Sequence, residues 1–328
     1  MVTMIDLFAG AGGFHLAFKD KAKCVFASEI DPQIAKVYEV NHNLKPHGDI
    51  TLDTTKNAIP EGFELLCAGF PCQAFSNAGL KMGFEDTRGT LFFDVADIAK
   101  KHKPSILFLE NVAGLISHKD GNTFKTILNT LDEIGYAVKY KVLNTMEYGN
   151  LPHNRARIYI VCFNKEKVSQ EKIDAFEFPA PVALTTKLAD CFEASPVDAK
   201  YYYTDAKYPK IYPDLDGSVS RTDTLYQRRR VGEVRENKSN VSPCLTANMG
   251  TGGHNVPFLR EVGGSIRKLT PRECFNLQGY DSSYNLSVKK VSDSKLYKIA
   301  GNSVSVPVLR RIADNIMVSL QRMEQPSN

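Results

Sequence analysis

The sequence predicts an α/β protein, in which a doubly wound, mostly parallel sheet is accompanied by a smaller, irregular and partly β domain. Two observations support this fold class. In the first half of the chain, short apolar runs alternate with amphipathic stretches, as strands and covering helices do in a parallel sheet. From about Val182 the alternation ends, and scattered prolines and the Gly/Asn-rich run Thr246–Val256 replace it without helical periodicity.

The elements of the first domain follow one another in order. The expected strands are Met4–Phe8, Lys23–Ser28, Leu65–Ala68, Ile106–Glu110, Ala137–Asn144 and Ile158–Phe163. The expected helices are Gly13–Lys19, Pro32–Asn41, Thr90–Lys101 and Thr123–Ile134. An apolar stripe in Val306–Leu320 predicts a C-terminal helix that packs back on this domain. We therefore expect a first domain formed by 1–181 plus 293–328 and a smaller second domain formed by 182–292.

Composition excludes several classes of protein. The chain has 328 residues, of which 43% are hydrophobic and 24% charged, so disordered and collagen-like chains are excluded. No apolar run approaches the roughly 20 residues of a spanning helix, and the start lacks a signal peptide's basic lead, so we expect a cytoplasmic protein without membrane contact. The seven cysteines form no Cys-x-x-Cys pair and indicate reduced thiols, without a metal site.

Positive charge is concentrated in one segment. Residues 225–272 hold nine Lys/Arg and three Glu, a net charge of +6, whereas the whole chain carries +4. The rest of the chain is therefore slightly acidic. A local basic stretch that is also rich in Gly, Asn, Ser and Thr is typical of a polyanion-binding surface, with an ordinary solvated face as the alternative.

A Gly-rich turn, Asp6–Phe14, joins the first expected strand to the first helix. Glycines there let the backbone approach a nucleotide-like ligand at the carboxyl end of the sheet. The dinucleotide fingerprint is incomplete, because His15 stands where the third Gly would be. Glu29 closes the next strand, where a carboxylate accepts hydrogen bonds from ribose hydroxyls. The turn indicates a mononucleotide-sized ligand with an adenosine group, and a tight turn with a helix cap is the alternative.

Two further polar residues follow strands of the expected sheet. Cys72 comes just after Leu65–Ala68 and can act as a nucleophile where its surroundings favour the thiolate. Glu110 ends the strand Ile106–Glu110, so we expect it on the same rim, where a buried carboxyl can donate to a ring nitrogen. Taken singly, such a cysteine is more often a buried structural thiol, and such a glutamate a helix cap or part of a surface ion pair.

Six segments, in order, make the sequence resemble the bacterial cytosine-5 DNA methyltransferases. They are Asp6–Phe14, Pro71-Cys72-Gln73, Glu110-Asn111-Val112, Arg155-x-Arg157, Arg267–Gly279 and Gly301-Asn302-Ser303-Val304. The run from Gly83 to Phe93 also fits the compact enzymes of restriction-modification systems. The match extends from Asp6 to about Val308 and is broken only across the variable region, Val182 to about Ser292. The resemblance therefore implies that 1–181 plus 293–328 form the catalytic domain that binds S-adenosylmethionine, and that 182–292 form the target-recognition domain. The resemblance implies the S-adenosylmethionine-dependent methyltransferase fold.

The resemblance also implies how the catalytic residues act. Cys72 would attack carbon 6 of cytosine as a thiolate, and Glu110 would bind ring nitrogen 3 and the exocyclic amine. Arg155 would help to order the site, and Arg157 would contact the base, which has to be flipped out of the duplex. For this arginine pair, alternating exposed positions at the start of a strand are the other interpretation.

The family pattern further assigns a pocket for S-adenosylmethionine. Its residues would be Phe8, Ala9, Gly10, Gly12, Gly13, Glu29, Ile30, Asp49, Ile50, Pro71, Leu91, Asn302 and Ser303. Glu29 would bind the ribose, and Asp49 with Ile50 the adenine. Ile30 departs from the Trp that is frequent in the family, so aliphatic packing would replace ring stacking. His153 departs from the usual Gln, and we assign it no catalytic role.

Double-stranded DNA is the expected partner. Basic residues of the variable region would contact phosphates, which position the protein without reading the sequence. The stretch Ala74–Thr90 would close as a lid over the flipped base. The candidate DNA contacts are Gln73, Ser76, Arg88, Arg228, Arg235, Thr246 and Thr251. We expect a monomer, paired with a restriction endonuclease of the same system.

Three other functions fit parts of the sequence. Methylation of tRNA would use the same Cys72 and Glu110, but the Cys-Phe-Thr tripeptide typical of that branch is absent. A catalytically idle DNA-binding protein would need neither of these residues, nor Arg157. A nicotinamide-dependent oxidoreductase would leave Cys72 and the basic segment unexplained. The sequence therefore favours an enzyme that methylates carbon 5 of cytosine in a short duplex DNA site.

Overall fold

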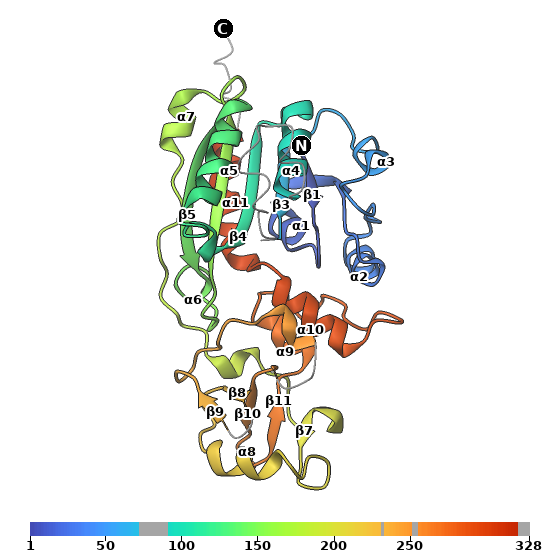
Figure 1. The fold of residues 1–328 in the computed structure, drawn as a ribbon, viewed down its shortest axis with the longest axis vertical. Helices are drawn as coiled ribbons and strands as arrows, with labels where there is room; N and C mark the ends of the chain where they lie inside the picture. The colour runs from blue at the N-terminus through green and yellow to red at the C-terminus, as the bar shows by residue number, and fades with distance from the viewer. Residues whose placement is uncertain (72–90, 231–232, 251–254, 321–328) are drawn as a thin grey trace. The chain divides into compact units, whose positions relative to one another are not determined.

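The computed structural model describes residues 1–71, 91–230, 233–250 and 255–320 (Figure 1). The chain divides into two compact units. The first comprises Met1–Leu143, Ala156–Ala180 and the chain from Val308, and the second comprises Asn144–Arg155 and Pro181–Pro307. These units are defined by packing alone, so the limits of a catalytic and a target-recognition domain stay a prediction.

A six-stranded sheet forms the centre of the first unit, in the order β2-β1-β3-β4-β6-β5. The strands are β1 (Val2–Leu7), β2 (Ala22–Ala27), β3 (Leu65–Gly69), β4 (Ile106–Val112), β5 (Tyr136–Asn144) and β6 (Ala156–Asn164). The pairs β1–β2, β1–β3 and β3–β4 are parallel, whereas β4–β6 is antiparallel. The predicted α/β class with a mostly parallel sheet is confirmed.

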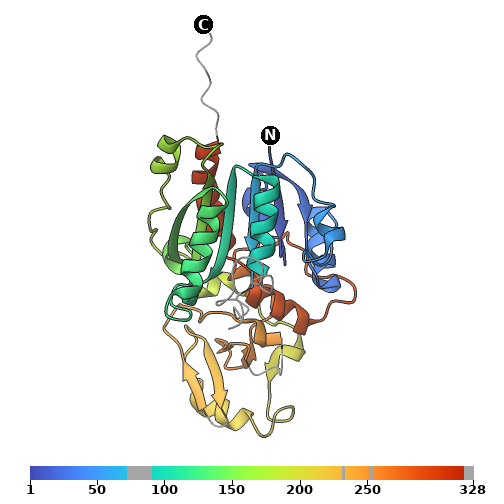
Figure 2. The same ribbon diagram turned by 45° about the horizontal axis from the view of Figure 1, so that its top comes forward.

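Helices cover both faces of this sheet. They are α1 (Gly13–Phe18), α2 (Pro32–His42), α3 (Asp53–Lys56), α4 (Leu91–His102), α5 (Asn122–Glu133), α7 (Gln170–Ala175) and α11 (Val306–Leu320), with a 3₁₀ turn, η1, at Ala113–Leu115. Figures 1 and 2 show α4 and α5 on one face and α11 on the other. Local sequence explains the start of α2, because Asp31 accepts hydrogen bonds from the backbone N–H groups of Gln33 and Ile34.

The sheet and its helices enclose an apolar core. It includes residues from β1, β3, β4 and β6 that are fully buried, such as Ile5, Leu66, Leu107 and Ile160. The apolar stripe predicted in α11 is buried as well, at Leu309, Ile312, Ala313 and Ile316. Helices cover both faces of the sheet, so β3 and β4 are buried along most of their length and not only at alternate positions. In the described ranges, no helix is long and apolar enough to cross a membrane.

The second unit contains a smaller antiparallel sheet in the order β7-β11-β10-β8-β9. Its strands are β7 (Tyr202–Tyr203), β8 (Tyr226–Arg230), β9 (Glu233–Glu236), β10 (Phe258–Arg260) and β11 (Ile266–Lys268). Its helices are α6 (Thr145–Tyr148), α8 (Tyr212–Ser218), α9 (Pro271–Asn276) and α10 (Asp293–Asn302), with 3₁₀ turns η2 (Leu188–Cys191), η3 (Ala199–Tyr201) and η4 (Ala247–Gly250). The expectation that helical periodicity is absent between Val182 and the C-terminal helix was wrong, because Leu296, Ile299 and Ala300 of α10 recur at helical spacing and are buried.

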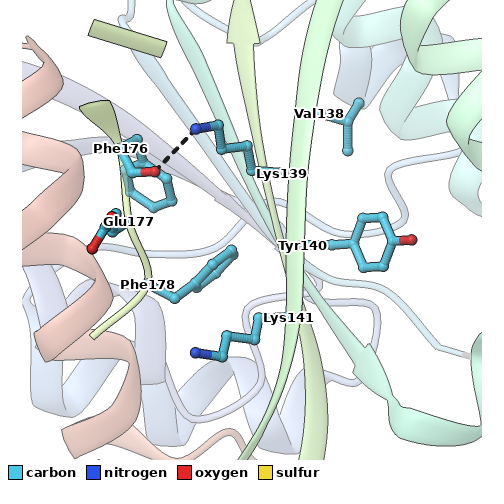
Figure 3. A pocket seen from close by; sticks show the side chains of 7 residues that line it. All are labelled: Val138, Lys139, Tyr140, Lys141, Phe176, Glu177 and Phe178. Carbon is cyan, nitrogen blue, oxygen red and sulfur yellow. Dashed lines mark hydrogen bonds between the residues drawn. The ribbon is translucent and has the colours of Figure 1, made fainter. Parts of the chain in front are cut away.

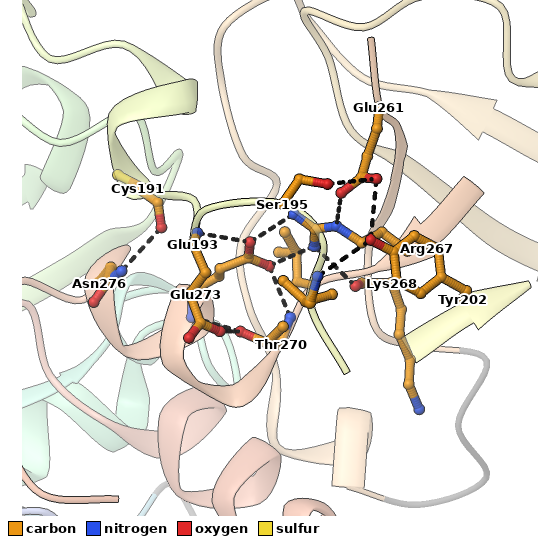
Figure 4. A network of polar contacts seen from close by, with 12 residues as sticks. Cys191, Glu193, Ser195, Tyr202, Glu261, Arg267, Lys268, Thr270, Glu273 and Asn276 are labelled. Atoms are coloured by element: carbon orange, nitrogen blue, oxygen red, sulfur yellow. Dashed lines mark hydrogen bonds and ion pairs between the residues drawn. The ribbon is translucent and has the colours of Figure 1, made fainter. Parts of the chain in front are cut away.

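Arg267 links the small sheet to α9 through a buried network of ion pairs (Figure 4). Its guanidinium donates two hydrogen bonds of 2.8 Å to Glu273, and its Nε lies 2.6 Å from Glu261. Glu273 also accepts a hydrogen bond from the Thr270 N–H and thereby closes the capping box that begins α9. Arg267 is 1% exposed and Glu273 is 0% exposed. Removal of Arg267 would leave the buried carboxylate of Glu273 without its cation.

Candidate active site

The carboxyl ends of β1, β3 and β4 lie in register at one edge of the large sheet. Leu7 pairs with Ala68, and Gly69 pairs with Glu110. The chain continues from Gly69 through Phe70 and the exposed Pro71. Glu110 therefore lies beside the strand that leads to Cys72. Cys72 itself lies outside the described residues.

Arg157 lies against the carboxyl group of Glu110. Its Nε is 3.2 Å from Glu110 Oε1, and the two side chains are 12% and 9% exposed, respectively. The antiparallel pairing of β4 and β6 explains the contact, because Arg157 stands opposite Val112, and Val112 shares a strand face with Glu110. The rim of the sheet thus carries an acidic group and a guanidinium side by side. A paired acid and cation can together bind a polar ring edge.

Asn111 connects the ends of β3 and β4. Its side-chain amide donates a 2.9 Å hydrogen bond to the carbonyl of Phe70, and its Oδ1 accepts one of 2.8 Å from the backbone N–H of Val112. The residue is 2% exposed, so both bonds are made away from water. Asn111 therefore holds the chain just before Pro71 and fixes the starting point of the segment that contains Cys72. Sequence reasoning missed this role, although a buried Asn beside Glu110 at a strand end was visible.

The Gly-rich turn after β1 is held by backbone hydrogen bonds. The N–H of Ala9 donates to the carbonyl of Ser28 at 2.9 Å, and that of Gly12 donates to the carbonyl of Ala9 at 2.7 Å. The N–H of Gly10 donates to Glu29 Oε2 at 3.0 Å. Glu29 therefore connects the end of β2 to the turn.

Left-handed backbone conformations shape the same turn. Phe8, Gly10 and Gly12 have φ values of 54°, 54° and 73°. A Cβ on Gly12 would lie 2.1 Å from His42 Nε2, so glycine is required at this position both by conformation and by space. Buried Gly13 follows and begins α1.

The candidate ribose and adenine contacts lie together beyond β2. The N–H of Glu29 donates to the carbonyl of His47 at 2.8 Å, and the N–H of His47 donates to the carbonyl of Ala27 at 2.8 Å. This pairing brings Asp49 and Ile50, which follow His47, to the same edge. Ile50 is buried in the core, and Asp49 is half-buried and accepts hydrogen bonds from Thr51.

Ile30 is an exposed apolar residue at this edge. Its side chain is 69% exposed directly after Glu29. Phe8 of the Gly-rich turn is a second apolar side chain that is only half-buried, and Glu29 and Asp49 are the carboxylates at this edge. Such a set fits an adenosine group, since a purine needs apolar faces and a ribose needs hydrogen-bond acceptors.

Asp6 is a fully buried carboxyl group beneath the turn. Burial raises the pKa of Asp6 well above its usual value, a hydrogen bond from the His15 backbone opposes the rise, and the charge of Glu29 adds to it. Both carboxyl oxygens are enclosed. Burial therefore favours the protonated, uncharged form of Asp6 beneath the turn. It was not among the site residues predicted from the sequence.

Most of the other cysteines are excluded as nucleophiles. Among the described residues, Cys24, Cys67, Cys162, Cys191 and Cys274 are buried. Burial raises the pKa of Cys24 and of Cys191 to about 12 and raises that of the other three as well. These thiols are un-ionised at neutral pH and cannot attack an electrophilic carbon efficiently. The remaining candidates are Cys244, which is half-buried, and Cys72.

Arg155 organises a cluster in the second unit. Its Nη1 donates to the carbonyl of Leu245 at 2.9 Å, and its Nη2 donates to the carbonyls of Gly301 at 3.2 Å and Ser303 at 2.5 Å. The side chain is buried, and these bonds tie the chain before η4 to the end of α10. Gly301 is required there, because a Cβ would lie 2.2 Å from the backbone of Thr246.

Two neighbouring residues of the predicted cofactor pocket, Asn302 and Ser303, differ in their exposure to solvent. Ser303 is buried and its Oγ lies 2.5 Å from the hydroxyl of Tyr280, whereas Asn302 is exposed. His153 is fully buried and accepts a hydrogen bond from the N–H of Leu245 at Nε2, so its Nδ1 donates to the carbonyl of Leu277 at 3.1 Å. His153 therefore links backbone segments of this unit. Leu91 begins α4 in the first unit and is half-buried.

The predicted DNA contacts are only partly described. Arg235 of β9 and Thr246 are exposed. Arg228 of β8 is 13% exposed and lies 3.8 Å from Asp214, so its charge is partly neutralised. Gln73, Ser76, Arg88 and Thr251 lie outside the described residues.

A hollow of about 390 Å³ lies at the edge of the large sheet (Figure 3). It is lined by part of β5 and by the chain from Phe176 to Phe178. Lys139 spans it and donates hydrogen bonds to the carbonyls of Asp174 and Phe176. None of the predicted site residues borders it. Across the described ranges, no cluster of three or more His, Cys, Asp or Glu residues could hold a metal ion.

Comparison with known proteins identifies the family. The sequence model of the C-5 cytosine-specific DNA methylases matches residues 2–318. The chain belongs to this family. It is 46% identical to the type II methyltransferase M.Bsp6I of Bacillus sp. (strain RFL6), over 98% of this chain and 100% of that protein. It is 40% identical to the type II methyltransferase M.HhaI of Haemophilus parahaemolyticus, over 97% and 95% of the two chains.

Solved structures share the fold of this cytosine-5 methylase. The S. pombe Dnmt2 methyltransferase superposes with a TM-score of 0.70 at 18% identity, covering 97% of this chain and 98% of that chain. A putative DNA modification methyltransferase encoded within an E. coli prophage gives a TM-score of 0.68 at 20% identity, covering 98% and 99%. Family membership confirms the resemblance found in the sequence and makes the protein a DNA (cytosine-5)-methyltransferase by class.

Proposed function

We propose that this methylase transfers a methyl group from S-adenosylmethionine to carbon 5 of a cytosine flipped out of duplex DNA, within a short recognition site. Family membership supports the reaction class. For this chain, the observation that carries the proposal is the Glu110–Arg157 pair at the sheet rim, in register with the strand that leads to Cys72.

The chemistry requires a nucleophile, because carbon 5 of cytosine is unreactive while the ring is aromatic. In the proposed reaction the Cys72 thiolate adds to carbon 6, and the electron pair displaced from the ring double bond makes carbon 5 nucleophilic. Glu110 binds ring nitrogen 3 and the exocyclic amine, where charge changes most. Arg157 holds Glu110 in place and contacts the base. Carbon 5 then takes the methyl group, and loss of the proton that it still carries expels the Cys72 thiolate and restores the ring double bond.

The first unit offers surroundings that suit the methyl donor. S-Adenosylmethionine, when bound, would supply a sulfonium methyl group that an electron-rich carbon can take, with S-adenosylhomocysteine leaving as a neutral thioether that keeps the electron pair of the broken S–C bond. Glu29 would bind the ribose hydroxyls, and the exposed Ile30 would cover the adenine, with Asp49 at its amino edge. The left-handed turn from Phe8 to Gly12 would bring backbone close to the donor. We further propose Ala9, Gly13, Ile50, Pro71, Leu91, Asn302 and Ser303 as pocket residues, and Arg155 as the residue that orders the last two.

Recognition of DNA is assigned to the second unit. Exposed Arg235 and Thr246 are candidates for contacts with bases or phosphates. Arg228 is a further candidate, with DNA replacing Asp214 as the partner of its guanidinium. Gln73, Ser76, Arg88 and Thr251 complete the proposed contacts. The names of the relatives, type II methyltransferases, support a role in restriction-modification. A cognate endonuclease, a monomeric state and a cytoplasmic location are part of the proposal.

The test is a transfer assay with labelled S-adenosylmethionine and either unmethylated genomic DNA or tRNA, followed by bisulfite sequencing. Wild type should label DNA at 5-methylcytosine within one short sequence, and Cys72→Ser should label neither substrate. Cys191→Ser is the matched control, since that thiol is buried and un-ionised, and it should retain activity. Label that enters only tRNA would contradict DNA as the substrate. Transfer by Cys72→Ser would contradict the covalent mechanism.

A further inference from the structure

Two histidines, His15 and His42, lie under the Gly-rich turn. His15 comes from α1 and His42 from the last turn of α2. Their rings stack with centroids 4.4 Å apart and an interplanar angle of 17°. Tyr38 completes the cluster, with its hydroxyl 2.8 Å from His15 Nδ1 and its ring centroid 4.4 Å from that of His42.

His42 contacts the turn directly. Its Nε2 lies 3.1 Å from the carbonyl oxygen of Ala11. A carbonyl only accepts hydrogen bonds, so Nε2 carries the proton. The next N–H along the chain, that of Gly12, donates to the carbonyl of Ala9 at 2.7 Å. Both polar groups of the Ala11–Gly12 peptide therefore have hydrogen-bond partners: the carbonyl accepts from His42, and the N–H donates to Ala9 within the turn.

The space around Gly12 shows how closely His42 fits. A Cβ at Gly12 would lie 2.1 Å from His42 Nε2 and 2.8 Å from Tyr38 Cε2. The imidazole therefore packs against the Cα of Gly12, with no space for another atom between them. Burial lowers the pKa of both His15 and His42 to about 4, so the stacked pair is neutral at neutral pH.

We infer that His42 is a positioning residue for cofactor binding: its Nε2–H holds the Ala11 carbonyl and so fixes the left-handed turn that receives the methyl donor. This inference rests on the proposed S-adenosylmethionine site. His15 supports the ring of His42 by stacking, and Tyr38 orients His15. The bond is lost without a donor at position 42 even where an aromatic ring remains.

The experiment compares His42→Phe, which keeps the ring and removes the donor, with His42→Gln, whose side-chain amide replaces Nε2–H. His42→Phe should raise the dissociation constant of S-adenosylmethionine, measured by calorimetry, about fivefold, as expected for one lost hydrogen bond. The kcat at saturating donor and the KM for DNA should stay within twofold of wild type. His42→Gln should bind the donor within twofold of wild type.

A control variant at another histidine and a measurement of stability distinguish the loss of a positioning contact from general destabilisation of the protein. His118→Phe removes a histidine near α5 that contacts Thr123, and it should leave donor affinity unchanged. Equal losses of affinity in His42→Phe and His42→Gln, or a lowered melting temperature with unchanged affinity, would overturn the inference alone. Absence of donor binding by wild type would overturn the proposed function and the inference together.

Discussion

The replacement Glu110→Gln separates the chemical role of Glu110 from its structural one. In the folded protein, Glu110 Oε1 lies 3.2 Å from Arg157 Nε, and the side chains are 9% and 12% exposed. At this separation and an effective dielectric of 20, the gross attraction between unit charges is about 5 kcal/mol, and most of it is offset by the desolvation of both groups. Gln has the same shape and keeps an uncharged amide oxygen or nitrogen where the carboxylate stood. We therefore expect unfolding free energy to fall by about 1 kcal/mol.

Activity should respond far more strongly to the same replacement. Gln cannot take up or give a proton at ring nitrogen 3, so the charge that develops on the ring loses its partner. We expect kcat to fall roughly 100- to 1,000-fold, in the range seen when a group that stabilises the transition state is removed. The assay is single-turnover methyl transfer with DNA and donor saturating, alongside urea unfolding. Asp132→Asn is the control, because its ion pair with Lys165 is exposed and lies outside the rim. A Glu110→Gln enzyme with more than a tenth of wild-type kcat would refute the reasoning.

Three further changes have defined outcomes. Arg267→Met leaves the fully buried Glu273 without its cation and should cost about 3–5 kcal/mol of unfolding free energy in urea, much of which Arg267→Met/Glu273→Leu should restore. Gly12→Ala imposes a side chain at φ 73° and 2.1 Å from His42, so it should lower stability by roughly 1–3 kcal/mol and weaken donor binding in calorimetry. The pKa of His15 and that of His42 are lowered to about 4, whereas unfolded histidine titrates near about 6.5. The unfolded state therefore binds more protons between these values, so stability should decrease as the pH is lowered through that window, by at most about 3 kcal/mol per histidine. The double variant His15→Phe/His42→Phe should show a flatter pH dependence of urea midpoints, and an unchanged slope would contradict the shifts.

Local sequence patterns predicted the strands of the large sheet and its helices well, because the apolar residues that become buried recur in the sequence at the spacing typical of these elements. All six strands of the first unit overlap their predicted ranges, and α2 begins at the predicted Pro32. Strand direction is set by the path of the chain, so the antiparallel placement of β6 was not visible in its apolar run. The helix α10 was missed because its ten residues include polar and charged side chains, and only three or four apolar positions mark its buried face.

The candidate site shows the same limit. Spacing alone puts Arg155 and Arg157 on one face of a strand. In the structure Arg157 contacts Glu110, whereas Arg155 donates hydrogen bonds to the carbonyls of Leu245 and Ser303. β6 begins only at Ala156, so strand periodicity does not extend to Arg155. The contact of His42 with Ala11 joins residues 31 positions apart, and no periodic signal reports such a pair.

The central claim is that Cys72 forms a covalent bond to carbon 6 of the target cytosine. It is tested most directly with duplex DNA in which 5-fluorocytosine replaces cytosine at the methylated position, because the adduct then lacks the carbon-5 proton whose loss expels the cysteine. With S-adenosylmethionine present, wild type should become linked to this DNA in a complex that survives denaturation, and mass spectrometry should locate the link at Cys72. Methyl transfer to ordinary DNA without a trapped complex, or a link at Cys244 or any other residue, would contradict the account.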